Sequence, residues 1–208
     1  MSDIFRLNLH IIPNWHDIRI CIITWARTAM SHKVDTDTIE RNSFLLRHLA
    51  LGNRGVSSEL HFDLDADRDE ANGWGKHSLQ LEMLVSELLI ETAVKFRVIL
   101  DVIRTHTGEP IEKTFQGGDS VGHFLPEMGE LRIREACNKV LHADGVSLNW
   151  QRSSSPAFDY WDGTVTLKGT KGQTAWQCSL TVGTFSDVLN DYMGEILQRG
   201  DYYGAWSR

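Results

Sequence analysis

The stretch SLQLEMLVSELLIETAVKFRVILDVIRT, residues 78–105, contains neither glycine nor proline and is rich in apolar side chains. The absence of helix-breaking residues predicts one continuous helix, about 40 Å long. Apolar residues occupy most of its circumference, which is typical of a helix in the centre of a bundle. Charged residues within such a helix should pair with another helix, because an unpaired buried charge costs several kcal/mol. The sequence therefore predicts a helical body organised around residues 78–105.

Helical patterns also flank this stretch. Apolar residues at three-to-four spacing predict a helix over 14–30 and a second from Asp35 or Asp37 to about residue 50, where Gly52 suits a C-terminal cap. The glycine-rich and acidic stretch 52–77 predicts a long loop. Residues 106–128 predict another loop, and residues 130–143 a further helix.

The hydrophobic period changes from helical to alternating near residue 145. Three alternating runs begin at Val146, Val165 and Trp176, and residues 169–172 suit the turn between the last two. An amphipathic pattern over 185–197 predicts a final helix. We therefore expect a mainly α fold, with a helical bundle over 1–145. Residues 146–208 should add a β-hairpin or small three-stranded antiparallel sheet and the final helix, packed on the bundle as one domain.

Composition limits the class of protein. The 208 residues carry 21 basic and 28 acidic side chains, a formal net charge of −7, which argues against a uniformly basic nucleic-acid-coating protein but leaves a local basic groove possible. The first 30 residues lack a signal-peptide layout, and the longest apolar run is too short to cross a membrane. The three cysteines are far apart and form no C-x-x-C pair, so we expect reduced thiols in a cytoplasmic protein.

Common catalytic motifs are missing from the sequence. It contains no H-E-x-x-H, no G-x-S-x-G and no glycine-rich phosphate loop, so neither a metal nor another cofactor is predicted. The acidic stretch 63–69 begins like a calcium-binding loop. However, Arg68 and Trp74 stand where an EF-hand needs glycine and a bidentate glutamate. A solvated acidic loop is therefore favoured there over a calcium site.

The helix predicted around 131–143 carries the residues with the most chemical potential. Arg134, Asn138 and His142 are four residues apart and share one face. Arginine can hold a phosphate, asparagine can orient a hydroxyl and histidine can move a proton near neutral pH, which together suit metal-free cleavage of RNA. The same spacing is also typical of a solvated helix face with a histidine near the C-terminal end of the helix dipole.

Three further residues are expected to support this face. Lys139 can form an ion pair with Glu135 one turn earlier. Glu91 or Arg97, on the helix 78–105, is expected to pair with another helix, and the helix 131–143 is the natural partner through Arg134, Asn138 or Lys139. The alternative is that these charged residues face solvent along one edge of the helix.

The residues Cys-Asn-Lys-Val-Leu-His at 137–142, following the charged apolar helix segment 88–97, resemble the HEPN superfamily of prokaryotic toxin and defence ribonucleases. The motif of that family is an arginine, a polar residue and a histidine four to six residues beyond the arginine. Asn138 and His142 match the last two, whereas Cys137 stands at the arginine position. The resemblance implies a cytoplasmic homodimer with its 131–143 helices facing one another, acting as a metal-independent endoribonuclease or RNA-binding protein in defence or toxin–antitoxin systems.

The missing motif arginine leaves two alternatives. Arg134 or Arg97 could replace it, or the chain is a catalytically inactive relative. A non-catalytic interaction module would use its helical body for assembly and its sheet, near Trp150, Trp161 and Trp176, to bind a protein partner.

Overall fold

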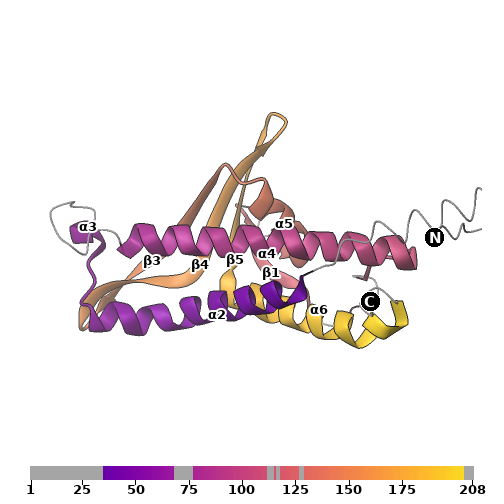
Figure 1. Ribbon diagram of the computed structural model, residues 1–208. Helices are drawn as coiled ribbons and strands as arrows, with labels where there is room; N and C mark the ends of the chain where they lie inside the picture. The colour runs from indigo at the N-terminus through magenta and orange to yellow at the C-terminus, as the bar shows by residue number, and fades with distance from the viewer. Residues whose placement is uncertain (1–34, 68–76, 112–114, 116–117, 127–128, 204–208) are drawn as a thin grey trace, which may run out of the picture. The chain divides into compact units, whose positions relative to one another are not determined.

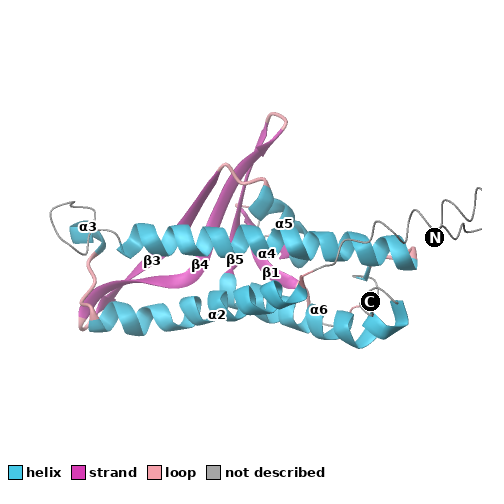
Figure 2. Ribbon diagram, in the orientation of Figure 1, coloured by secondary structure: helices cyan, strands magenta, loops and turns pink. Residues whose placement is uncertain are grey.

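The computed structural model describes residues 35–67, 77–111, 115, 118–126 and 129–203. The helix predicted over 14–30 lies outside this part of the chain. Within it, three long helices lie along one face of an antiparallel sheet (Figures 1 and 2). Alternate residues of the longest strand, from Trp161 to Gly169, are buried, as expected for a sheet with one covered face.

Helix α2 spans Thr36–Glu59, and Asp35 is its N-cap, with its carboxylate accepting a hydrogen bond from the Thr38 backbone N–H at 3.1 Å. The prediction that this helix ends at Gly52 is wrong. The helix continues because Asn53 and Ser57, one turn apart, are buried and bond to each other at 3.2 Å. A second short helix, α3 (Leu64–Asp67), occupies part of the predicted loop.

Helix α4, His77–Thr107, confirms the predicted long helix. One of its faces is buried against the rest of the core, including Val85, Ala93 and Phe96. The opposite face is exposed over much of its length, so α4 covers one side of the structure and is not enclosed by a bundle.

The sheet has five strands in the order β2-β1-β5-β4-β3, all antiparallel. The predicted mainly α bundle with a three-stranded sheet is therefore wrong, and the fold is α+β. The strands expected after residue 145 are present as β3 (Gly145–Ser154), β4 (Ala157–Lys171) and β5 (Thr174–Thr181). Strands β1 (Ser120–Leu125) and β2 (Glu130–Arg132) extend the sheet on the other side of β5.

Strands β1 and β2 lie where the sequence predicts a loop and the start of a helix. Strand β1 lacks a clear alternating pattern because Gly122 interrupts it. Gly122 cannot carry a side chain, since a Cβ atom there would lie 2.0 Å from the Ser179 carbonyl oxygen of β5. Strand β2 shortens the following helix, α5, to Ile133–Leu141.

Helix α6, Val182–Tyr203, confirms the predicted final helix and follows β5 directly. Its apolar side chains, including Phe185, Leu189 and Ile196, are buried in the common core. Arg47 of α2 and Asp187 of α6 form an ion pair at 2.8 Å at the surface of the contact between the two helices.

Strand β4 is longer than β5, and the pairing between them begins only at Thr164. Residues 157–163 therefore have a partner strand, β3, on one side only. The end of α2 and the following turn supply the missing partners. The Trp161 N–H donates to Asn53 Oδ1 at 2.7 Å, and the Asp159 N–H donates to the Phe62 carbonyl at 2.8 Å. The sheet is thereby joined to α2 by a hydrogen bond to the Asn53 side chain and to the turn after α2 by a backbone hydrogen bond.

We expect Asn53→Ala to lower the free energy of unfolding by about 1–3 kcal/mol, because the buried Trp161 N–H then loses its acceptor. Urea unfolding followed by circular dichroism measures the change. Asn190→Ala, at an exposed position of α6, is the matched control and should change stability by less than about 0.5 kcal/mol. Equal stability of the two variants would contradict this role of Asn53.

Candidate functional site

Helix α5 presents the predicted site residues on its polar side. Its buried face consists of Ile133, Ala136, Cys137 and Val140. Asn138 is partly exposed, and His142 is the exposed C-cap, whose backbone N–H donates to the Asn138 carbonyl at 3.1 Å. The sequence therefore places the polar stripe correctly, with His142 just beyond the last helical residue.

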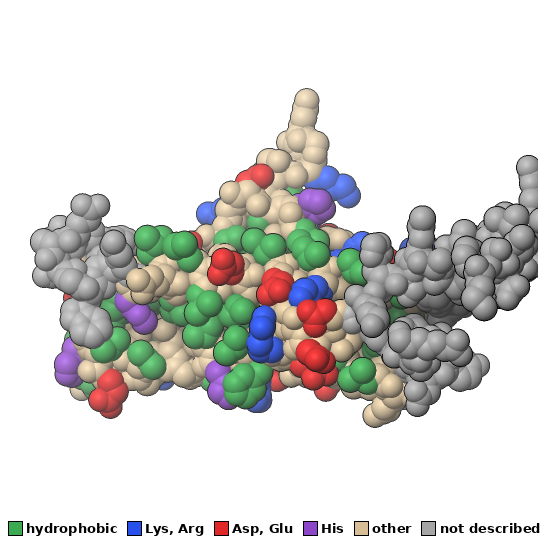
Figure 3. All heavy atoms as spheres, in the orientation of Figure 1, with side chains coloured by type: hydrophobic (Ala, Val, Ile, Leu, Met, Phe, Trp, Pro, Cys, Tyr) green, Lys and Arg blue, Asp and Glu red, His purple; other side chains and the backbone are tan. Residues whose placement is uncertain are grey.

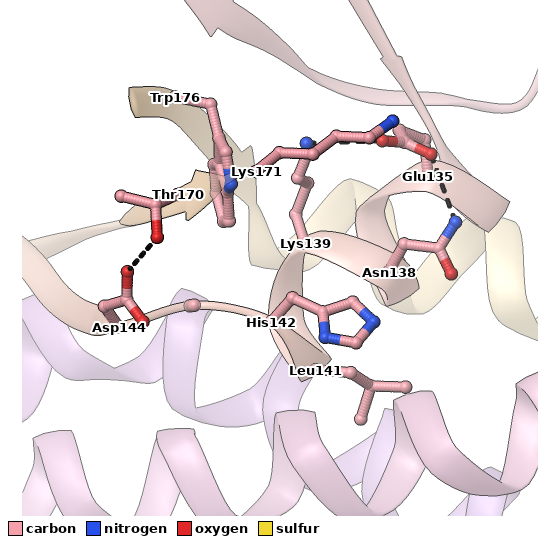
Figure 4. A pocket seen from close by; sticks show the side chains of 10 residues that line it. Glu135, Asn138, Lys139, Leu141, His142, Asp144, Thr170, Lys171 and Trp176 are labelled. Carbon is pink, nitrogen blue, oxygen red and sulfur yellow. Dashed lines mark hydrogen bonds and ion pairs between the residues drawn. The ribbon is translucent and has the colours of Figure 1, made fainter. Parts of the chain in front are cut away.

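A half-open pocket of about 690 Å³ lies between the end of α5 and the hairpin of β4 and β5 (Figure 4). Asn138, Lys139 and His142 line it from α5 and its cap. Thr170, Lys171 and Trp176 line it from the hairpin, and the carboxylates of Glu135 and Asp144 also reach it. The pocket thus combines two lysines, a histidine and an aromatic wall with two acids.

Trp176 of β5, which forms the aromatic wall of the pocket, contacts both the neighbouring strand β4 and helix α5. Its ring lies over Gly169 of the paired strand, where a Cβ atom would be 2.3 Å from the ring. Lys139 Nζ lies 4.3 Å from the ring centroid, a cation–π contact, and 3.4 Å from Glu135 Oε1. The side chain of Lys139 is only 13% exposed, so its ammonium is held between the ring and the carboxylate.

A polar network connects this pocket to α4. Arg97 of α4 donates a hydrogen bond to Asn138 Oδ1, and Asn138 Nδ2 donates to Glu135 Oε2 at 3.1 Å. Because Glu135 also pairs with Lys139, the contacts run from α4 to the lysine at the pocket. The predicted pairing of Arg97 with the helix around 131–143 is confirmed.

Arg134 lies outside the pocket lining. Its guanidinium donates to Asp101 Oδ1 of α4 at 3.1 Å, and Arg97 approaches the same carboxylate at 3.7 Å. Asp101 is thus shared by two arginines. The positive charge of Arg134, which the sequence made a candidate for phosphate binding, is therefore paired within the chain.

Glu91 faces α2 and not α5. Asn42 Nδ2 donates to Glu91 Oε2 at 2.8 Å, and Lys95 Nζ lies 3.2 Å from Oε1. The hydrogen bond from Asn42, followed by that from Lys95, lowers the pKa of Glu91. Glu91 therefore pairs with another helix, but this helix is α2 and not the helix 131–143 that it was expected to support, because Glu91 lies on the side of α4 that packs against α2.

Cys137, at the position of the HEPN motif arginine, is fully buried in the core. Burial raises the pKa of its thiol to about 12. The side chain at this position lies in the core and does not line the pocket.

The sheet tryptophans do not form one exposed docking surface. Trp161 is buried, and Trp176 lines the pocket. Trp150 packs against Phe62, with 5.3 Å between the ring centroids.

Asp144, Thr170 and Lys171 also line the pocket, although no pattern in the sequence marked them as site residues. The turn pattern at residues 169–172 predicts the β4–β5 hairpin, but it does not predict that the hairpin lies beside α5. That position depends on long-range contacts, such as the hydrogen bond from the Asp144 N–H to the Lys168 carbonyl at 2.8 Å.

The described ranges were also searched for metal-binding groups and membrane-spanning helices. No group of three or more histidine, cysteine, aspartate or glutamate side chains there could hold a metal ion. In the acidic stretch, Asp63 accepts hydrogen bonds from the backbone of Asp65 and Ala66, at 3.0 and 3.2 Å, and the part of that stretch beyond Asp67 lies outside the description. No described helix is long and apolar enough to cross a membrane.

Comparison of the chain with protein-family models, with curated proteins and with solved structures finds no match.

The two buried cysteines predict a specific pattern of thiol reactivity. In a Cys21→Ser variant, Cys137 and Cys178 should both stay unreactive toward a disulfide reagent at pH 8, since burial raises their pKa values to about 12 and about 11. At pH 8 about one Cys137 side chain in ten thousand is then a thiolate, and burial also keeps the reagent from reaching it. Both thiols should react in denaturant. A thiol that reacts within minutes in the folded protein would contradict this packing.

Proposed function

We propose that this protein binds RNA in the pocket between α5 and the β4–β5 hairpin and cleaves it without a metal ion. The observation that carries the proposal is the convergence of Asn138, Lys139 and His142 with Lys171 and Trp176 around one half-open cavity. Cations, a titratable imidazole and an aromatic wall are the groups that suit a nucleotide phosphodiester.

The lysines take the phosphate-binding role in this proposal. Arg134 is paired with Asp101 outside the pocket, whereas Lys171 is exposed at the pocket rim. Lys139 lies deeper in the pocket, between Trp176 and Glu135, and would meet a phosphate held by Lys171. Asn138 is a positioning residue, because it links Arg97 to Glu135 and so holds the helix face on which Lys139 stands.

His142 is the proposed general base. The 2′-hydroxyl of the bound RNA gives its proton to the neutral imidazole, and the 2′ oxygen forms a bond to phosphorus. The bond from phosphorus to the 5′ oxygen breaks, leaving a 2′,3′-cyclic phosphate and a 5′-hydroxyl that takes its proton from water. The internal nucleophile removes the need for a metal-activated water.

The resemblance of residues 137–142 to the HEPN superfamily extends the proposal to a role in prokaryotic defence or toxin–antitoxin systems. The buried Cys137 argues that the motif arginine of that family has no counterpart at its usual position. The proposal therefore rests on the pocket lysines and His142, and the resemblance supplies only the biological setting.

We expect the purified full chain to cleave single-stranded or structured RNA in the presence of a chelator and to leave DNA of the same sequence intact. His142→Ala should slow cleavage about 100-fold or more, in the range typical of a lost general base. The matched control is His123→Ala on β1, a residue outside the pocket lining, which should cleave at the wild-type rate. Gel analysis of end-labelled RNA measures both.

Binding is tested separately with Lys171→Met. This variant should bind RNA more weakly whatever its sequence. The slope of log binding constant against log salt concentration should become shallower by about one unit, because one phosphate contact is lost. Cleavage unaffected by His142→Ala would contradict the catalytic role, as would a wild-type chain that binds RNA but never cuts it. Binding unchanged in Lys171→Met would contradict the site itself.

A further inference from the structure

The pocket between α5 and the β4–β5 hairpin contains two carboxylates with different surroundings. Glu135 is committed within the chain, because its oxygens lie 3.4 Å from Lys139 Nζ and 3.1 Å from Asn138 Nδ2. Asp144 is exposed and, among the described residues, has no ion-pair partner. Its side chain accepts one hydrogen bond there, from Thr170 Oγ1 to Oδ2 at 3.3 Å. The other oxygen, Oδ1, is therefore open to a ligand.

Contacts with β4 hold the Asp144 carboxylate in place. The Asp144 N–H donates to the Lys168 carbonyl at 2.8 Å, and Thr170, which contacts the carboxylate, lies two residues further along the same strand. The segment after α5 is therefore attached to the hairpin through both its backbone and a side chain. A carboxylate fixed in this way is preorganised, so less conformational entropy is lost when a ligand binds to it.

An unpaired carboxylate is unfavourable in a pocket that binds phosphate alone. Like charges repel, and Asp144 would weaken the attraction of the anion to Lys139 and Lys171. The carboxylate becomes favourable where the ligand also presents N–H groups, because it accepts charge-assisted hydrogen bonds from them. In RNA, the N–H donors lie on the edges of the bases. Asp144 is thus suited to a base, and the two lysines are suited to the phosphate.

The order of these groups across the pocket matches the order of the groups in a ribonucleotide. In Figure 4, Asp144 lies on one side of His142 and Glu135 lies on the other. The Lys139 ammonium, 3.4 Å from Glu135, marks the phosphate side. In a ribonucleoside 3′-phosphate, the base, the 2′-hydroxyl and the phosphate are attached to the consecutive carbons C1′, C2′ and C3′. With the phosphate near Lys139 and the 2′-hydroxyl at His142, the base lies toward Asp144.

We propose that Asp144 binds the base of the nucleotide in this pocket and selects guanine. The inference rests on the proposed RNA binding at this site and names the substrate class, RNA with guanosine on the 5′ side of the scissile phosphate. A carboxylate only accepts hydrogen bonds. Guanine presents two adjacent donors, N1–H and N2–H, on its Watson–Crick edge, and the carboxylate accepts both in a bidentate pair.

The other three bases fit this acceptor less well. Adenine and cytosine each present one amino donor beside a ring nitrogen that is itself an acceptor. Uracil presents one N–H between two carbonyl groups. Each of these edges places an acceptor against an oxygen of Asp144, so the second hydrogen bond of the pair is lost. A good bidentate pair typically discriminates against the wrong base by about tenfold or more.

The rest of the pocket is compatible with a nucleotide but does not choose the base. Its volume of about 690 Å³ lies within the range of roughly 300–1,000 Å³ that is typical of small-ligand sites. Figure 3 shows basic and histidine side chains together at the base of the projecting hairpin, which favours the approach of a phosphate. Stacking on an aromatic wall such as Trp176 tolerates every base. Discrimination therefore depends on the hydrogen bonds of Asp144.

Titration of the full chain with the four nucleoside 3′-monophosphates tests the inference without requiring cleavage. Isothermal titration calorimetry should give a dissociation constant for guanosine 3′-monophosphate at least about tenfold below those of the adenosine, cytidine and uridine compounds. With RNA as the substrate, the same preference should place the ends of the cleavage products after guanosine.

Asp144→Asn should remove the guanine preference, because the amide offers one acceptor and one donor in place of two acceptors. That pattern fits the amino group and ring nitrogen of adenine, so the ratio of the guanosine to the adenosine dissociation constant should rise at least about tenfold. A merely structural role of Asp144 would weaken the binding of all four nucleotides alike. Asp191→Asn, at an exposed position of α6 outside the pocket lining, is the matched control and should keep the ratio within about twofold.

The possible results separate this inference from the proposed cleavage. Equal affinities for the four nucleotides, or a guanine preference that Asp144→Asn leaves unchanged, would overturn the inference, and RNA cleavage by the same preparation would leave the proposed function standing. A guanine preference that depends on Asp144 in a chain that never cuts RNA would support the inference and reject catalysis by His142. A chain that binds none of the four nucleotides at millimolar concentration would overturn both.

Discussion

The fold depends on a strand that is longer than its neighbour. Strand β4 has 15 residues and β5 has eight, so the first part of β4 presents buried N–H groups with no strand to accept them. Buried backbone donors without acceptors are rare because each costs free energy comparable to a lost hydrogen bond. The Asn53 side chain of α2 and the Phe62 carbonyl in the following turn accept hydrogen bonds from two of these N–H groups. This need fixes where α2 lies, how far it must extend and where the chain turns after it.

Local patterns in the sequence predicted the elements whose stability is local. The long α4, the final helix α6 and the strands β3 to β5 all follow from hydrophobic periodicity. Strand β1 exists through pairing with distant β5, and β2 exists through pairing with β1. Gly122 interrupts the pattern of β1, and β2 has only three residues, so no short window of sequence reveals either strand. The extension of α2 past Gly52 has the same origin. Two helical glycines cost about 1 kcal/mol each, and the buried bonds of Asn53 outweigh that cost.

The residues that α5 contributes to the candidate site were largely predictable from the sequence, whereas those of the hairpin were not. Spacing along one helix grouped Arg134, Asn138 and His142, of which only the last two line the pocket, together with Lys139 from the adjacent ion pair. The pairing of Arg97 with that helix followed from the cost of an isolated charge in α4. The partners of Arg134 and Glu91 were not predictable, since they depend on which side of α4 meets α5 and which meets α2. The hairpin half of the pocket required the strand order, which the sequence did not reveal.

The pocket has two walls of different kinds. The α5 wall stands on a buried helix face and on contacts to α4, so a substitution there disturbs the core as well as the site. The hairpin wall beyond Gly169 is different, because residues 170–175 are exposed and contribute nothing to the core. Insertions and substitutions at the hairpin tip can therefore reshape what the pocket accepts while the fold is kept. Selectivity in this architecture can evolve, or be engineered, separately from stability.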